Sequence, residues 1–259
     1  MGTVDGSRAF EQVHPGAIYL HLGQQYRVVT LDLDDRVALV EPVVVDEYTQ
    51  VRSQMQVSIL GADDLREVGR AELFLGPVEI ATEVVGYERH DSRTRQLIGR
   101  EELTLPPARL VTRAFWYTID DEVLDRARLA PEQVPGALHA AEHAGIGILP
   151  LFTICDRWDV GGVSTILQAE TGLPTILIYD GYPGGAGIAE LAFDAAPRHA
   201  RATLDLIAAC SCDAGCPSCV QSPKCGNWNE YLDKRAAVVM LGLMTPERHV
   251  VSPGPRPAR

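Results

Sequence analysis

Residues 210–225 read Cys210-Ser-Cys212-Asp-Ala-Gly-Cys216-Pro-Ser-Cys219-Val-Gln-Ser-Pro-Lys-Cys225 and hold five of the six cysteines of the chain. This density indicates a tetrahedral metal site, because four thiolates around one ion replace the hydrophobic core that a short loop cannot build. Cys216 and Cys219 form a C-x-x-C turn that can present two sulfurs to one ion. Nearby glycines and prolines favour tight turns. We call residues 210–225 the cysteine knuckle.

The knuckle offers five sulfurs for four ligand positions. We expect one structural Zn²⁺, bound by Cys212, Cys216, Cys219 and Cys225, with Cys210 as the alternate ligand. An iron–sulfur cluster takes four thiolates as well, and spacing does not separate the two. Disulfides would need an oxidising compartment, and residues 1–16 show no apolar segment or cleavage site of a signal peptide, so we expect a cytoplasmic protein. Cys155 stands alone in an apolar stretch and is expected to be a buried small hydrophobe.

Composition limits the classes of protein that the chain can represent. With 259 residues and 46% hydrophobic content, it can bury one large core or two small ones. No apolar stretch reaches the roughly 18 residues of a membrane span, so no membrane partner is expected. The net charge of −12 argues against nucleic-acid binding by overall charge alone.

The sequence predicts an α+β protein in two parts. Residues 1–118 carry strand patterns rich in β-branched and aromatic residues, and we expect an antiparallel barrel-like domain there. Its strands are predicted at 17–22, 25–33, 36–46, 66–76, 77–90 and 108–119.

Residues 119–245 are expected to form a mixed α/β domain, and residues 246–259 a disordered tail. In the mixed domain we expect a buried strand over 171–180 and helices over 135–149, 188–193, 197–209 and 229–244, the last capped by Asn227 or Asn229. The knuckle would then lie between two helices.

The segment His139-Ala-Ala-Glu142-His143 spells the H-x-x-E-H motif of one class of metalloproteases. On a helix the two histidines share a face and can bind zinc beside Glu142. On this interpretation the protein is a stand-alone zinc metallohydrolase. Its zinc site would need a third ligand, such as Glu170, Glu190 or Glu230. The alternative is that both histidines form hydrogen bonds within a core or an interface.

Two loops offer weaker signals. The glycine-rich loop 181–187 follows a strand and precedes a helix, a place where backbone N–H groups can bind an anion, although its glycine spacing fits no nucleotide motif and a simple tight turn is the alternative. Asp156, Asp159 and Asp180 can together bind a divalent ion as in a nuclease, or form ordinary loop contacts.

A basic and aromatic stretch over 87–100 can follow a phosphate backbone and stack a base. Its candidate nucleic-acid contacts are Arg89, Arg93 and Arg95, to which we add Lys224 of the knuckle. Acidic residues interrupt the stretch, so a solvated hairpin is the alternative.

Several of these segments together resemble one family. The knuckle with its continuation Gly226-Asn227 and Asn229-Glu230-x-Leu232-Asp233-Lys234 resembles the zinc-binding C-terminal module of MrfA-type superfamily 2 DNA helicases. The segments 13–21, 139–144, 155–162 and 179–187 also match its pattern, so the resemblance covers residues 10–245.

The resemblance implies an accessory region of an ATP-dependent 3′-to-5′ DNA helicase that acts in DNA repair. In such proteins the region packs on the motor domains of the same chain and helps to form the path of single-stranded DNA. The sequence contains neither a Walker A loop nor a DExH box, so we expect a C-terminal fragment that is not itself an ATPase. The partners implied are the motor domains and single-stranded DNA.

Overall fold

Three long strands organise the structure, a computed structural model that describes residues 1–246. They are β4 (Glu47–Ile59), β6 (Ala71–Asp91) and β8 (Ala108–Thr118). The sheet that contains them has the strand order β4-β6-β8-β10-β9, and β5 and β7 also pair with β6. The predicted tail falls, from residue 247 onward, outside the described residues.

The chain divides into two compact units, one of residues 1–56 and 80–109, the other of residues 57–79 and 110 onward. Each long strand contributes residues to both units. The sequence predicted a single boundary near residue 118, whereas each unit is built from two separate segments of the chain. A hydrophobicity pattern does not reveal such interleaving, because one continuous strand serves both units.

The first unit contains a three-stranded antiparallel sheet in the order β1-β2-β3. A small core of Val13, Ala17 and Val28 lies against it. Gly16 adopts a left-handed φ of 85°, and a Cβ there would collide with the Tyr87 side chain. The elements of this unit, besides parts of the long strands, are η1 (Gly6–Arg8), α1 (Ala9–Gln12), β1 (Ile18–His21), β2 (Gln24–Asp32), β3 (Val37–Val43) and β7 (Leu97–Glu102).

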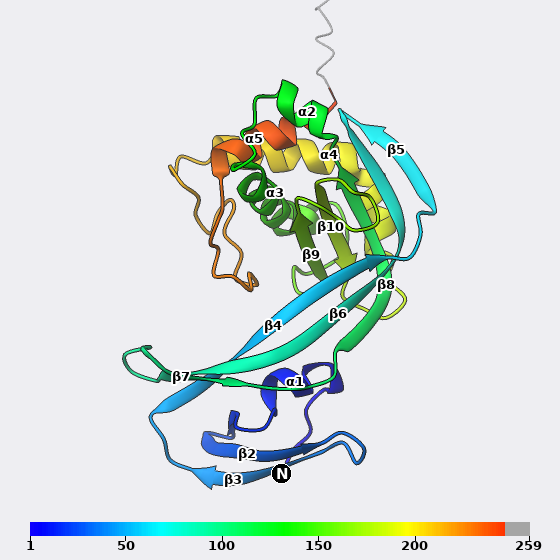
Figure 1. Ribbon diagram of the computed structural model, residues 1–259. Helices are drawn as coiled ribbons and strands as arrows, with labels where there is room; N and C mark the ends of the chain where they lie inside the picture. The colour runs from blue at the N-terminus through cyan, green and yellow to red at the C-terminus, as the bar shows by residue number, and fades with distance from the viewer. Residues whose placement is uncertain (247–259) are drawn as a thin grey trace, which may run out of the picture. The chain divides into compact units, whose positions relative to one another are not determined.

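The second unit is built around β10 (Thr175–Asp180), in which every residue is buried. It pairs antiparallel with β8 on one side and with β9 (Val160–Thr165) on the other. Helices α3 and α4 pack against this part of the sheet, and α5 packs on both helices (Figure 1). The remaining bounds are β5 (Asp64–Val68), α2 (Asp121–Arg126), α3 (Val134–Ile148), η2 (Leu149–Leu151), α4 (Ile188–Ala209) and α5 (Lys234–Leu243).

The predicted α+β class is confirmed: a β-rich N-terminal region precedes a mixed domain in which the cysteine knuckle lies between α4 and α5. Across the described residues, no helix combines the length and apolar character that a membrane crossing requires.

Several predicted boundaries were wrong. The strands expected over 66–76 and 77–90 do not end at residues 76 and 77, because β6 continues through Gly76 and Pro77. Glycine is needed there because the Gly61 carbonyl lies where a Cβ would sit. Strands β4, β7 and β9 were not predicted; β7 is largely exposed, and β9 contains a Gly-Gly pair that is typical of a loop.

The two helices that flank the knuckle also differ from prediction. The helices expected over 188–193 and 197–209 form one helix, α4, with Pro197 inside it. Helix α5 begins at Lys234 instead of residue 229, because its cap is Asp233, whose carboxylate accepts a hydrogen bond from the Ala236 N–H at 2.9 Å. The left-handed φ angles of Trp228, Asn229 and Tyr231 exclude an α-helix over residues 228–231.

The glycine-rich loop before α4 wraps around the carboxylate of Asp180. This fully buried side chain accepts hydrogen bonds from the backbone N–H groups of Ala186 (2.5 Å), Ile188 (3.2 Å) and Ala189 (2.8 Å). The Asp180 carboxylate therefore occupies the place at this helix start where an external anion could bind. This arrangement explains the glycines as a turn rather than as a phosphate site.

We expect Asp180→Ala to lower the free energy of unfolding by about 3 kcal/mol, because it leaves three N–H groups at a buried helix start without an acceptor. Urea unfolding would measure the loss. Asp120→Ala is the control, since that exposed residue caps α2 through one hydrogen bond from Glu122 and its removal costs about 1 kcal/mol. Equal losses for the two variants would contradict this role of Asp180.

Candidate metal centre

The cysteine knuckle begins where α4 ends. Cys210 is the C-cap of α4 and has an extended backbone, which turns the chain away from the helix. The first residue of α5, the buried Lys234, reaches back to the same place. Its ammonium group donates hydrogen bonds to the carbonyls of Cys210 (2.6 Å) and Cys212 (2.5 Å). One lysine therefore ties the start of α5 to the end of α4.

Four sulfurs converge at this junction. The Sγ atom of Cys210 lies 3.6 Å from that of Cys212 and 3.6 Å from that of Cys216. The Sγ atom of Cys219 lies 3.5 Å from that of Cys212 and 3.8 Å from that of Cys216. Four thiolates around a tetrahedral Zn²⁺, with Zn–S bonds of about 2.3 Å, stand about 3.8 Å apart. The spacing of these sulfurs fits one four-coordinate ion.

The turn between Cys216 and Cys219 presents both sulfurs to the same point. The Cys216 carbonyl accepts hydrogen bonds from the N–H groups of Cys219 (3.0 Å) and Gln221 (3.1 Å). The Cys216 N–H in turn donates to the Cys219 sulfur at 3.3 Å. Gly215 has a φ of 115°, and a Cβ there would collide with Val220. The turn is fixed by backbone bonds and by the absence of a side chain at Gly215.

The electrostatic setting favours a thiolate at Cys212 and a cation at Lys234 beside it. Burial raises the pKa of Cys212, but hydrogen bonds from Cys219, from other knuckle thiols and from Lys234 outweigh it and lower this pKa to about 7. Burial raises the pKa of Cys219 to about 12. Burial lowers the pKa of Lys234, yet the hydrogen bond and charge of Cys212 raise it overall. The ammonium group therefore stays charged beside the sulfurs.

The structure differs from the ligand set expected from the sequence at one position. It brings Cys210 into the cluster and leaves Cys225 outside it. The backbone places Cys210 at the helix end, two residues from Cys212, whereas the six residues after Cys219 carry the chain away to α3. We call Cys210, Cys212, Cys216 and Cys219 the four-sulfur cluster. Cys155, half-buried against the core, is a free thiol outside it.

Cys225 lies instead in a second group, with His139 and His143 of α3. The two histidines are one helical turn apart, and their ring centroids are separated by 4.2 Å. Burial lowers the pKa of His139 and, together with the charge of His139, lowers that of His143 to about 4. Both rings are therefore neutral at pH 7.

Glu142, the acid of the H-x-x-E-H motif, is not part of this group. It is buried, and one of its carboxylate oxygens accepts a hydrogen bond from the Ser164 hydroxyl of β9 at 3.1 Å. Burial raises its pKa to about 7. No carboxylate among residues 1–246 joins the two histidines, so Glu170, Glu190 and Glu230 do not supply the third ligand of a protease site.

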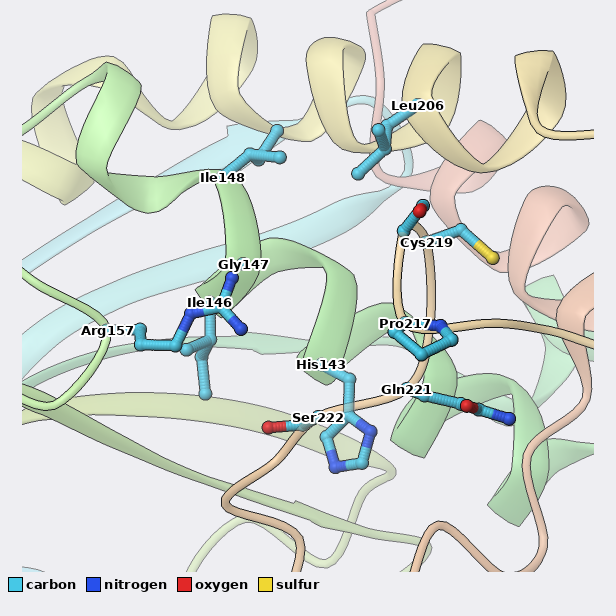
Figure 2. Close-up of a pocket in the computed structure, with 11 residues that line it drawn as sticks. His143, Ile146, Gly147, Ile148, Arg157, Leu206, Pro217, Cys219, Gln221 and Ser222 are labelled. Atoms are coloured by element: carbon cyan, nitrogen blue, oxygen red, sulfur yellow. The ribbon is translucent and has the colours of Figure 1, made fainter.

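A small pocket of about 110 Å³ lies between α3, α4 and the knuckle. Figure 2 shows His143, Leu206, Pro217 and Cys219 among the side chains that line it. Pockets that bind drug-sized molecules measure about 300–1,000 Å³. This pocket is too small to hold a peptide substrate beside His143.

The aspartates considered for a nuclease site make ordinary structural contacts. Asp159 accepts hydrogen bonds from the Tyr182 hydroxyl (2.5 Å) and the Asp156 N–H (2.7 Å). Asp156 accepts one from the Trp158 N–H at 3.0 Å. Asp180 caps α4. Within the described part of the chain these carboxylates do not form a metal-binding group.

Comparisons with known proteins point to the same region. A family profile described as "MrfA Zn-binding domain" matches residues 141–220. The ATP-dependent helicase YprA of Bacillus subtilis is 37% identical over 85% of this chain and 29% of its own length. A Methanocaldococcus jannaschii protein is 38% identical over 40% of this chain and 96% of its own length. The crystal structure of the helicase MrfA bound to DNA superposes with a TM-score of 0.71, at 34% identity, over 92% of this chain and 31% of that chain.

This chain belongs to the MrfA Zn-binding domain family. It spans less than a third of the length of YprA and of MrfA. The matched residues, 141–220, include the four-sulfur cluster and end before Cys225. The family match therefore covers the part of the chain that holds the four-sulfur cluster.

The four candidate nucleic-acid residues have different surroundings in the structure. Arg89 donates hydrogen bonds to the Glu47 carboxylate at 3.2 and 3.0 Å. Lys224, in the other unit, is half-buried and donates to the carbonyls of Arg157 (3.0 Å) and Val160 (2.5 Å). Arg93 and Arg95 are exposed in the turn between β6 and β7, and neither forms an ion pair with the described residues. These two arginines have their charges available for a partner.

We expect Cys210→Ala to lower both the metal content and the melting temperature, because it removes one of four sulfurs that converge on one point. Elemental analysis and thermal unfolding measure the two effects. Cys155→Ala is the matched control and is expected to keep its metal. Full metal content in the Cys210→Ala protein would contradict the assignment of that cysteine to the cluster.

Proposed function

We propose that this chain is a non-catalytic accessory module that binds structural Zn²⁺ through the four-sulfur cluster and works with an ATP-dependent helicase motor on DNA. The observation that carries the proposal is the structural match to MrfA, whose solved structure is bound to DNA, over nearly the whole of this chain. Because that match covers less than a third of MrfA, we assign ATP hydrolysis to motor domains elsewhere in the parent protein. The module would pack on that motor.

The zinc assignment rests on ligand chemistry. Four thiolates in tetrahedral spacing leave no position for substrate, which is the pattern of structural zinc sites. The cluster joins the end of α4 to the start of α5. We propose that the ion holds these helices in place and takes no part in a reaction. None of the six cysteines forms a disulfide, which fits a reducing cytoplasm, where we place the protein.

We further propose that the module helps to bind single-stranded DNA during repair, using the β6–β7 turn of the first unit. The Asp91 carboxylate fixes this turn by accepting hydrogen bonds from the N–H groups of Arg93 (3.0 Å) and Thr94 (2.7 Å). Arg93 and Arg95 therefore lie in a turn whose backbone is held by these hydrogen bonds. Two such charges can contact phosphates even though the chain as a whole is acidic.

We expect the chain to bind a fluorescent single-stranded oligonucleotide weakly, with an affinity that falls as salt rises. The double variant Arg93→Ala/Arg95→Ala should bind more weakly and show a salt slope smaller by about 0.7 for each lost phosphate contact. Fluorescence anisotropy across a salt series measures both.

Arg126→Ala is the control for lost charge, because that exposed arginine lies on α2 and pairs only with the neighbouring Glu122 in the described structure. Unchanged DNA binding in the double variant would reject the turn as the contact. Metal-dependent cleavage of DNA or peptide that is lost in the Glu142→Gln variant would instead favour the hypothesis of a zinc metallohydrolase.

A further inference from the structure

The second group of possible ligands, His139, His143 and Cys225, joins a helix to a loop that is distant in sequence. Their ligand atoms all lie within 4.8 Å of one another. The Sγ atom of Cys225 is 3.6 Å from Nε2 of His139. The histidines are at i and i+4 on α3, so they face the same way. The sequence pattern contained both histidines but gave no sign that Cys225 is their neighbour.

The distance between sulfur and nitrogen fits a shared ion. In a tetrahedral zinc site with Zn–S of about 2.3 Å and Zn–N of about 2.05 Å, the two ligand atoms lie about 3.6 Å apart. A neutral imidazole and a cysteine sulfur are also ligands that Zn²⁺ prefers. The observed separation of 3.6 Å between Cys225 and His139 agrees with that value.

Metal-binding histidines commonly hydrogen-bond to the protein through their other ring nitrogen, and His143 does so here. Nδ1 of His143 lies 2.8 Å from the carbonyl of Val220, a buried hydrogen bond that leaves Nε2 without its proton. His139 makes hydrogen bonds to the backbone of Glu230 and Tyr231, while its Nε2 faces the Cys225 sulfur. Both rings are therefore oriented by protein partners outside the group.

The loop that carries Cys225 is held in an unfavourable backbone conformation. Trp228, Asn229 and Tyr231 all have left-handed φ angles between 57° and 63°. Such residues cost free energy and persist only when surrounding contacts fix them. The Asn229 N–H donates a hydrogen bond to the Cys225 sulfur at 3.2 Å, and that sulfur lies 2.6 Å from the Asn227 side-chain oxygen. A ligand bond at Cys225 would anchor this segment to α3.

We propose that His139, His143 and Cys225 bind a second metal ion, a divalent cation of the zinc class, separate from the ion of the four-sulfur cluster. The site fastens the C-terminal end of the knuckle to α3. It has three ligands among the described residues, so solvent would complete the coordination. The proposal does not depend on DNA binding or on a helicase partner.

Metal stoichiometry tests the proposal. The chain would be purified under reducing conditions, saturated with Zn²⁺, freed of excess by gel filtration and analysed for zinc per protein. We expect two ions in the wild type, one in Cys225→Ser and one in His139→Gln. Cys155→Ser, a thiol outside both groups, should keep two. One ion in the saturated wild type, or two in Cys225→Ser, would overturn the proposal.

Cobalt substitution identifies which ion remains. The absorption of a four-thiolate Co²⁺ site should persist in Cys225→Ser and His139→Gln, because their four-sulfur cluster is intact. Circular dichroism would show whether each variant folds. If Cys225→Ser does not fold, His139→Gln decides alone: one ion with the four-thiolate spectrum supports a separate second site, and any other count contradicts it.

Discussion

The approach of four sulfur atoms to within 3.8 Å of their neighbours is the constraint on which the C-terminal part of the second unit depends. Four thiolates at that spacing repel one another unless a cation offsets their charge. A divalent ion would neutralise two of these charges, and the buried ammonium of Lys234 adds a third positive charge. Because the sulfurs follow α4 and the lysine begins α5, the same group of charges fixes the junction of both helices.

Other buried polar side chains of the second unit also join neighbouring elements, through hydrogen bonds to the backbone at helix ends and loops. The Asp180 carboxylate accepts hydrogen bonds from backbone N–H groups at the start of α4. The Lys234 ammonium donates hydrogen bonds to backbone carbonyls at the end of α4. His143 bonds to the backbone of the knuckle at Val220. In each case a charged or polar side chain replaces the bonds that a helix end or loop lacks.

Much of this architecture could be predicted from the sequence. The cysteine spacing predicted a metal knuckle between two helices, and the β-branched runs predicted the N-terminal strands. The motif pattern gave the helicase resemblance, which the family match confirms. Contacts between distant residues could not be predicted. Nothing local distinguishes Cys210 from Cys225 as the fourth sulfur, because the choice depends on where the chain turns after Cys219. The neighbourhood of Cys225 and His139, 86 residues apart, is likewise a property of the fold.

The most direct test compares the thermal unfolding of the reduced protein before and after removal of its metal by a chelator. If the ion holds α4 and α5 together, the metal-free protein should melt at a temperature lower by about 10 °C or more. Restored zinc should return the original value. A reduced, metal-free protein that melts at the same temperature as the zinc-loaded one would contradict the account.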